Sequence, residues 1–206
     1  MADTVIIFDF ETTGLSPDQG SRVTEVAAVS IRNGKIIDEF QSLMNAGVTI
    51  PPFIEYYTGI TNEMIRNAPP IQEVMNRFAE FIGIDTLVAH NASFDRKFLD
   101  SEFSMIGEKR KQNICCSMRV ARRVYPQAPN HKLGTLAAYA GVEVKGRHHR
   151  ALTDAMMTTG LWLEMIDELR RRFQLSHVPM NLMYDIQEIH TKSLHTYMSK
   201  RRKVKP

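Results

Sequence analysis

Near the N-terminus a short apolar run ends in two acidic residues, and this junction limits the architectures open to the chain. Residues 5–8 (VIIF) are β-rich, too few for a helix and apolar at successive positions, which is typical of a central strand buried on both faces. Asp9 and Glu11 follow two residues apart, so an extended chain projects both carboxylates from one face of the sheet. Repulsion and desolvation make this pairing costly, and a bound divalent cation removes the cost. The alternative is an acidic turn in which residues 12–14 act as caps and hinge.

Further strands and helices follow in an order that indicates a mixed α/β domain. Residues 23–31 and 36–43 are β-rich and flank an Asn-Gly turn, which predicts a hairpin, and residues 86–89 supply a fourth strand. Ser93 is the expected N-cap of the helix that follows this strand, and a last helix is expected over residues 184–198. Apolar residues at helical spacing predict the other helices near residues 71–81, 93–106, 117–124, 133–139 and 151–173.

Length and composition exclude several classes of protein. The 206 residues, 43% of them hydrophobic and 24% charged, suit one folded domain with an appendage and disfavour intrinsic disorder or collagen-like repeats. The two cysteines, Cys115 and Cys116, are adjacent and lack metal-ligand spacing, so we expect buried or incidental thiols in a reducing compartment. No apolar run approaches the roughly 18 residues that cross a bilayer. We therefore expect a soluble, cytoplasmic protein with no membrane partner.

Charge is distributed unevenly along the chain. The formal net charge of +3 is too small to indicate a partner by itself. A cluster of basic side chains near the C-terminus comprises Lys200, Arg201, Arg202, Lys203 and Lys205. Two interpretations of this tail remain open, a disordered solubilising end and a nonspecific phosphate-binding arm.

Two more acidic residues and a histidine occupy positions that suit a shared site. Asp95 comes shortly after the fourth strand, in the first turn of the next helix, where the helix dipole alone also favours an acid. Asp154 lies early in the longest predicted helix, and His149, five residues before it, stands on the preceding loop. Taken alone, such a histidine is more often a surface residue, so the order of all these pieces has to carry the argument.

Taken together, the motifs resemble a known family, the DEDDh 3′ to 5′ exonucleases, and more narrowly the DnaQ-type proofreading subunits of bacterial DNA polymerase III. The resemblance covers roughly residues 4–173. It rests on residues 8–15 (FDFETTGL), 59–61 (GIT), 90–95 (HNASFD), 133–136 (LGTL) and 149–154 (HRALTD).

The resemblance implies a fold and a domain organisation. The expected fold is ribonuclease-H-like α/β, with a central mixed sheet of about five strands flanked by helices. Residues 1–174 would form the exonuclease domain, and residues 175–206 a C-terminal extension with the basic tail.

The resemblance also implies a metal site and a general base. Asp9, Glu11 and Asp154 would hold the first of two Mg²⁺ or Mn²⁺ ions, with Asp9 bridging to the second and Asp95 binding mainly through water. These are hard oxygen ligands, and two such cations can neutralise a phosphodiester, activate water and stabilise the departing oxygen. His149 is the expected general base. The family spacing selects it over His148, which the chemistry of an imidazole alone does not.

Contacts to the end of a nucleic acid are implied for a further set of residues. Thr12 and Gly14 would meet the terminal nucleotide, whereas apolar or aromatic side chains would stack on bases without reading sequence. The full set is Thr12, Gly14, Leu15, Ile60, Asn91 and Phe94. Core packing remains the alternative for Leu15, Ile60 and Phe94. Tyr57 precedes Thr58 where the family often carries a histidine, a departure from the pattern.

The expected function is a metal-dependent 3′ to 5′ exonuclease that releases nucleoside 5′-monophosphates from single-stranded or frayed DNA, in proofreading or repair. RNA is the nearest rival substrate, with 3′-end trimming as the activity. A non-catalytic interaction module is the rival of another class. A proofreading subunit would dock on a DNA polymerase through residues 174–206, which is compatible with activity.

Overall fold

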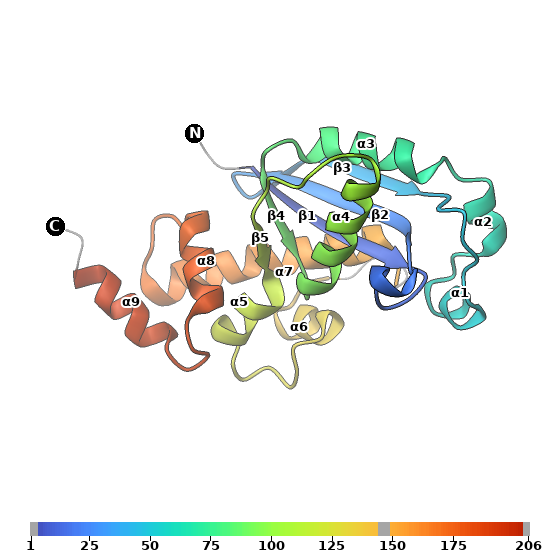
Figure 1. Ribbon diagram of the computed structural model, residues 1–206. Helices are drawn as coiled ribbons and strands as arrows, with labels where there is room; N and C mark the ends of the chain where they lie inside the picture. Colours follow the sequence, from blue (N-terminus) through green and yellow to red (C-terminus); the bar gives the residue numbers. More distant parts are fainter. Residues whose placement is uncertain (1–3, 144–148, 204–206) are drawn as a thin grey trace.

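A five-stranded mixed sheet forms the centre of the molecule (Figure 1). The computed structural model describes residues 4–143 and 149–203. The strand order is β3-β2-β1-β4-β5, with β1, β2 and β3 antiparallel and β4 and β5 parallel to β1. The strands are β1 (Val5–Thr12), β2 (Val23–Arg32), β3 (Lys35–Leu43), β4 (Thr86–Ala89) and β5 (Ile114–Cys116). The expected α/β fold with a central mixed sheet is confirmed.

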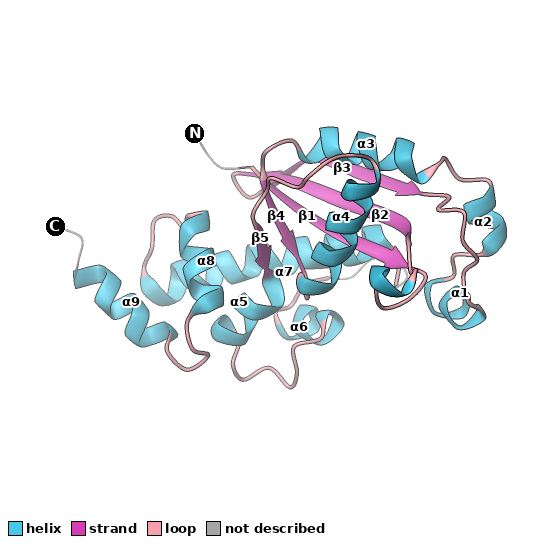
Figure 2. Ribbon diagram, in the orientation of Figure 1, coloured by secondary structure: helices cyan, strands magenta, loops and turns pink. Residues whose placement is uncertain are grey.

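Helices cover both faces of this sheet (Figure 2). Between β3 and β5 lie α1 (Pro52–Thr58), α2 (Asn62–Arg66), α3 (Ile71–Ile82) and α4 (Ser93–Met105). The later helices are α5 (Ser117–Val124), α6 (Leu133–Tyr139), α7 (Ala151–Phe173), α8 (Met180–Glu188) and α9 (Leu194–Lys203). A short 3-10 helix, η1 (Pro17–Gln19), follows β1.

The alternation of side chains along β1 divides the apolar interior into two layers. Ile6, Phe8 and Phe10 pack with α3 and α4, whereas Val5 and Ile7 pack with α5, α7 and α8. All five are buried, and each contributes roughly 1.5–3 kcal/mol of transfer free energy. The prediction that residues 5–8 form a central strand is confirmed, and the strand continues through the acidic residues to Thr12.

The chain beyond α7 differs from the expectation of one helix over residues 184–198. It forms two helices, α8 and α9, separated at Ile189, which is extended (φ −63°, ψ 160°), and by the polar residues 190–193. Leu182 and Ile186 of α8 and Met198 of α9 are buried in the core that α7 shares with the sheet. Burial of these spaced apolar residues holds both helices in place, although the apolar pattern across the break is weak.

Three other elements were absent from the sequence-based expectation or were placed differently. The region around Pro51 contains α1 and α2, and the short strand β5 precedes α5. The expectation that Ser93 caps α4 is wrong, because Ala92 is the N-cap and Ser93 is already the first helical residue. A positive φ of 65° at Asn91 turns the chain into the helix earlier than the Ser93 signal suggests.

The cysteine and basic-tail expectations have distinct outcomes. Cys115 and Cys116 are buried free thiols, as expected. The tail is helical through Lys203, and Arg201 pairs with Asp185 at 2.9 Å, whereas Lys205 lies outside the described residues. Within the described part of the chain, every helix is too short or too polar to traverse a lipid bilayer.

Candidate active site

The acidic cluster begins at the C-terminal end of β1. Antiparallel pairing with β2 continues to Thr12 and sets Glu11 opposite Glu25. Because side chains alternate along a strand, Asp9 and Glu11 leave the sheet on the same face as Ile7, which α7 covers. The strand therefore presents two carboxylates toward α7.

The third carboxylate comes from α7. Asp154 is the fourth residue of this helix, and its backbone N–H donates to the carbonyl of Arg150 at 3.1 Å. One carboxylate oxygen from each of Asp9, Glu11 and Asp154 lies within 4.8 Å of the others. A set of hard anionic oxygens at this spacing suits a divalent cation such as Mg²⁺ or Mn²⁺. The structure thus brings together three residues that are 145 positions apart in the chain.

The fourth acid, Asp95, comes from the layer of helices on the other face. It lies in the first turn of α4 and is only 2% exposed. Its charge is the largest cause, after burial, of the raised pKa of Asp9, so the two carboxylates lie close together. Burial raises the pKa of Asp95 to about 7, opposed by hydrogen bonds from the backbone of Asp95 and Phe10.

The remaining pKa shifts show how costly this concentration of acids is. Burial, followed by the charges of Asp95, Glu11 and Asp154, raises the pKa of Asp9 well above its usual range. Burial and then Asp154 and Glu25 raise the pKa of Glu11 to about 8. The folded chain alone disfavours the ionised cluster, and a divalent cation would offset both the repulsion and the desolvation.

The stability of the metal-free protein is expected to fall as the pH rises. Glu11 has a pKa of about 8 in the folded chain against 4.5 for the free group, so between these values the folded state binds more protons than the unfolded state. The free energy of unfolding then decreases with pH by on the order of a few kcal/mol, or roughly 5–10 °C in Tm. Thermal unfolding with chelator across this window checks the expectation. Added Mn²⁺ should raise Tm more at pH 8 than at pH 4.5, and Glu11→Gln should flatten the pH dependence. A flat Tm in the wild type would contradict it.

His149 lies on the loop immediately before α7. Its φ is +62°, and its ring stacks on that of Tyr57, with centroids 3.8 Å apart and an interplanar angle of 28°. The charges of Glu11 and Asp154, after burial, raise the pKa of Tyr57, which places this aromatic pair at the edge of the acidic cluster. His148, the other candidate for the base, lies outside the described residues.

A buried ion pair anchors this loop and the start of α7. Glu25 of β2 is 0% exposed, and its two carboxylate oxygens accept from Arg150 at 2.8 and 3.0 Å. One of them also accepts from the backbone N–H of Ala151 at 3.1 Å, in the first turn of the helix. A bidentate pair of this kind fixes orientation as well as distance. Sequence reasoning missed Glu25, although a lone acid inside an otherwise apolar strand was a usable signal.

The segment after β1 carries three of the residues expected to touch substrate. The Thr12 hydroxyl donates to the carbonyl of Gly14 at 2.7 Å, which closes a tight turn. A Cβ at Gly14 would meet Ser21 Oγ at 2.5 Å, so this position has no room for a side chain. Leu15 is 77% exposed and is available to a ligand.

The other three expected substrate residues differ in exposure. Ile60 is fully buried with Ile50 and Ile65, so in this structure it belongs to a small apolar core. Asn91 is exposed on the turn before α4. Phe94 is partly buried, and its ring lies 5.0 Å from that of Phe98.

Comparison with known proteins decides the family. The RNase_T model, described as exonuclease, matches residues 6–162, most of the chain. The chain belongs to this exonuclease family. It is 35% identical over 192 residues to the PolC-type DNA polymerase III of Caldanaerobacter subterraneus and 39% identical over 168 residues to that of Bacillus cereus. These matches cover 93% and 81% of the chain, but only 14% and 12% of the two polymerases.

Solved structures share the fold of this exonuclease. Exonuclease X in complex with 5′ overhanging duplex DNA superposes with a TM-score of 0.70 at 27% identity, covering 89% of this chain and 99% of that one. E. coli exonuclease I in complex with a dT13 oligonucleotide gives 0.72 at 17% identity, covering 84% of this chain and 43% of that one. The nuclease domain of 3′hExo, a DEDDh family member bound to rAMP, gives 0.68 at 21% identity, covering 80% and 92%.

The family assignment confirms the hydrolytic exonuclease class and the resemblance to DEDDh exonucleases. The ribonuclease-H-like fold is confirmed by the same comparison. Membership of the family implies the use of a divalent metal, and the carboxylates of Asp9, Glu11 and Asp154 fit that requirement.

Proposed function

We propose that this exonuclease removes nucleoside 5′-monophosphates from the 3′ end of single-stranded or frayed DNA. The observation that carries the proposal is the convergence of Asp9, Glu11 and Asp154 within 4.8 Å, at the end of β1. The DNA substrate is supported by the PolC-type relatives and by the structural neighbours that hold DNA. Proofreading or repair is the process that such relatives suggest.

The four acids divide between direct and indirect metal contacts in this proposal. Asp9, Glu11 and Asp154 hold one ion, Asp9 also reaches a second, and Asp95 acts mainly through water. Two Mg²⁺ or Mn²⁺ ions supply charge neutralisation at the phosphodiester and polarisation of the attacking water. The high pKa values of the unliganded acids support this assignment, because the cluster is unfavourable without positive charge.

His149 serves as the general base. An imidazole titrates near neutrality, so it can accept the proton that the attacking water loses. Its position supports the role, because the stack on Tyr57 and the anchored neighbour Arg150 restrict the loop beside the acids. Tyr57 is then a positioning residue for the base.

The terminal nucleotide is held next to the acids by a small set of residues. In the proposal, the turn formed by Thr12 and Gly14 approaches it closely, and the exposed side chain of Leu15 offers a base-stacking surface. Asn91 and Phe94 line the pocket from the turn before α4 and from its first residues. Contact with Ile60 requires the small core around it to open, since the side chain is 0% exposed.

Several wider expectations stay predictions alongside this proposal. They are the boundary between residues 1–174 and 175–206, docking on a DNA polymerase through the C-terminal segment, and a cytoplasmic location. RNA is the rival substrate, and no described residue decides against it. A non-catalytic interaction module has less support, because the acids and His149 are all present.

The experiment that tests the function offers end-labelled single-stranded DNA, duplex DNA and RNA to the protein with Mg²⁺, with Mn²⁺ and with chelator. The expected result is metal-dependent shortening of a 5′-labelled DNA strand in a ladder, with single-stranded DNA degraded fastest. A 3′ label should appear at once as a mononucleotide. Faster loss of RNA would transfer the activity to RNA, and no turnover with either ion would remove the catalytic assignment.

A further inference from the structure

A groove lined by arginines lies between α4, α5 and α8. It has a volume of about 500 Å³, and its charged lining consists of four arginines and one carboxylate, a net charge of +3. These residues are Arg96 from α4, Arg119, Arg122 and Arg123 from α5, and Glu188 from α8. The groove therefore has the charge of an anion-binding surface.

Most of this positive charge has no carboxylate partner within the described part of the chain. Arg119 pairs with Glu188 at 2.8 Å. Arg123 donates to backbone carbonyls, and burial together with the charges of Arg119 and Arg122 lowers its pKa. Arg96 and Arg122 are exposed and form no ion pair among residues 4–143 and 149–203. A bound anion would relieve the repulsion among these guanidinium groups.

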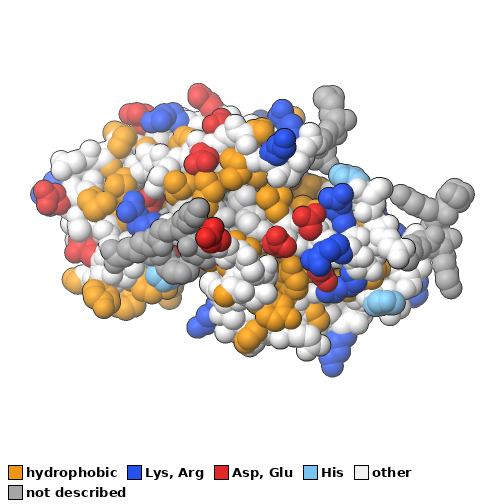
Figure 3. Space-filling view, turned by 180° about the vertical axis from the view of Figure 1, so that it is seen from behind, with side chains coloured by type: hydrophobic (Ala, Val, Ile, Leu, Met, Phe, Trp, Pro, Cys, Tyr) orange, Lys and Arg blue, Asp and Glu red, His pale blue; other side chains and the backbone are white. Residues whose placement is uncertain are grey.

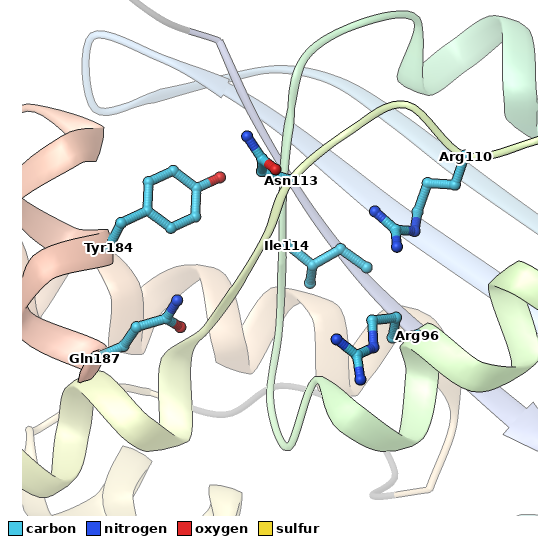
Figure 4. Close-up of a pocket in the computed structure, with 6 residues that line it drawn as sticks. All are labelled: Arg96, Arg110, Asn113, Ile114, Tyr184 and Gln187. Carbon is cyan, nitrogen blue, oxygen red and sulfur yellow. The ribbon is translucent and has the colours of Figure 1, made fainter.

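A second pocket, of about 430 Å³, continues this surface along α4. It shares Arg96 and Gln187 with the groove and adds Arg110. Figure 4 shows the guanidinium groups of Arg96 and Arg110 directed toward the side on which Gln187 of α8 lies. Arg110 is paired with Asp100 at 2.7 Å, so Arg96 contributes the uncompensated charge where groove and pocket meet.

The groove is continuous with the acidic cluster through the first turn of α4. Asn91 and Ser93 line the groove, and the buried Asp95 lies two residues beyond Ser93, beside Asp9. A nucleic acid that leaves the acidic cluster past this turn meets the arginines directly. A different part of the surface is apolar, because hydrophobic side chains gather over α1 (Figure 3). Three large ones, Phe53, Tyr56 and Tyr57, are exposed there.

We infer that the arginine groove binds phosphodiester groups of the nucleic acid whose 3′ end occupies the acidic cluster. Guanidinium groups match phosphate oxygens in geometry and remain charged at every physiological pH. The inference rests on the proposed function and adds a second contact region, outside the catalytic residues. The phosphates belong either to the strand being shortened or to a paired strand, and the choice of DNA distinguishes the two.

The test compares two double variants that remove the same charge. Arg96→Ala with Arg122→Ala changes the groove, whereas Arg77→Ala with Arg171→Ala removes two exposed arginines outside it. Binding of a labelled 20-nucleotide single strand and of a duplex with an unpaired 3′ end is measured by anisotropy over a salt series, with Ca²⁺ in place of Mg²⁺. The groove variant should bind about tenfold more weakly and lose about 0.7 from the log–log salt slope for each phosphate contact on a single strand.

The outcomes separate the groove from the active site. The control variant should bind like the wild type, and all three proteins should hydrolyse a nitrophenyl ester of thymidine 5′-monophosphate equally, because this probe does not reach the groove. Loss on both DNAs assigns the contacts to the shortened strand, and loss on the duplex alone assigns them to the paired strand. Equal binding by the two double variants overturns the inference. Failure of the wild type to hydrolyse the ester and DNA overturns the proposed function instead, and the binding comparison remains readable.

Discussion

Asp9→Ala is expected to abolish Mg²⁺-dependent release of mononucleotides while the domain stays folded. Asp9 lies at the centre of the acidic cluster, because the charges of Asp95, Glu11 and Asp154 all act on it. Loss of a ligand shared by two ions removes several kcal/mol of transition-state stabilisation, a decrease of about 10³-fold or more in kcat. Single-turnover hydrolysis of labelled single-stranded DNA measures the loss.

The stability of the same variant provides an independent check. Because the pKa of Asp9 is raised by burial and like charge, its ionised form destabilises the metal-free fold. The metal-free Asp9→Asn protein should therefore unfold at the same temperature as the wild type or higher, and it should gain less stability from Mn²⁺. Asp38→Ala, on the exposed part of β3, is the matched control and should retain full activity. Undiminished turnover by Asp9→Ala would remove this residue from the metal site.

His149→Ala is expected to slow hydrolysis by about 10²- to 10⁴-fold and to leave metal binding largely intact. The imidazole accepts a proton in the proposed reaction, but it is not one of the three grouped carboxylate ligands. The measurements are kcat as a function of pH and Mn²⁺ affinity by calorimetry. The acidic limb of the pH profile that belongs to the base should disappear in the variant.

Two further histidine variants make this assignment specific. His190→Ala changes an exposed histidine after α8 and should behave as the wild type. His148→Ala should cause a much smaller loss than His149→Ala. If His148→Ala instead causes the large loss, the assignment of the base is displaced by one residue. Tyr57→Phe should retain activity, since the ring stack with His149 needs no hydroxyl.

The fold was predictable where local signals and burial agree. The strand at residues 5–8, the hairpin through Asn33 and Gly34, and the long helix over residues 151–173 all combine strong propensity with a regular apolar pattern. The signals were weaker for α1, where Phe53 and Tyr56 are exposed, and for the three-residue strand β5. Elements this short have too few positions to display a period, so neighbouring segments decide them.

The site was predictable in its members but less so in its supports. Asp9 and Glu11 share a face because a strand alternates, which holds for any extended chain. Glu25 and Tyr57 belong to the surroundings of the site through contacts made across 125 and 92 positions of sequence, to Arg150 and His149. No local pattern specifies such pairings.

The amino-acid order alone determined the chemistry available to this exonuclease, namely four carboxylates, an imidazole and the motifs that relate them to a family. Tertiary structure alone decided which of these groups meet and at what distance, how far burial raises their pKa values, and that the arginines of α4 and α5 line one groove. The physical reason is that propensity and periodicity act over a few residues. Distance, desolvation and charge repulsion depend on segments that only the packed sheet and helices bring together.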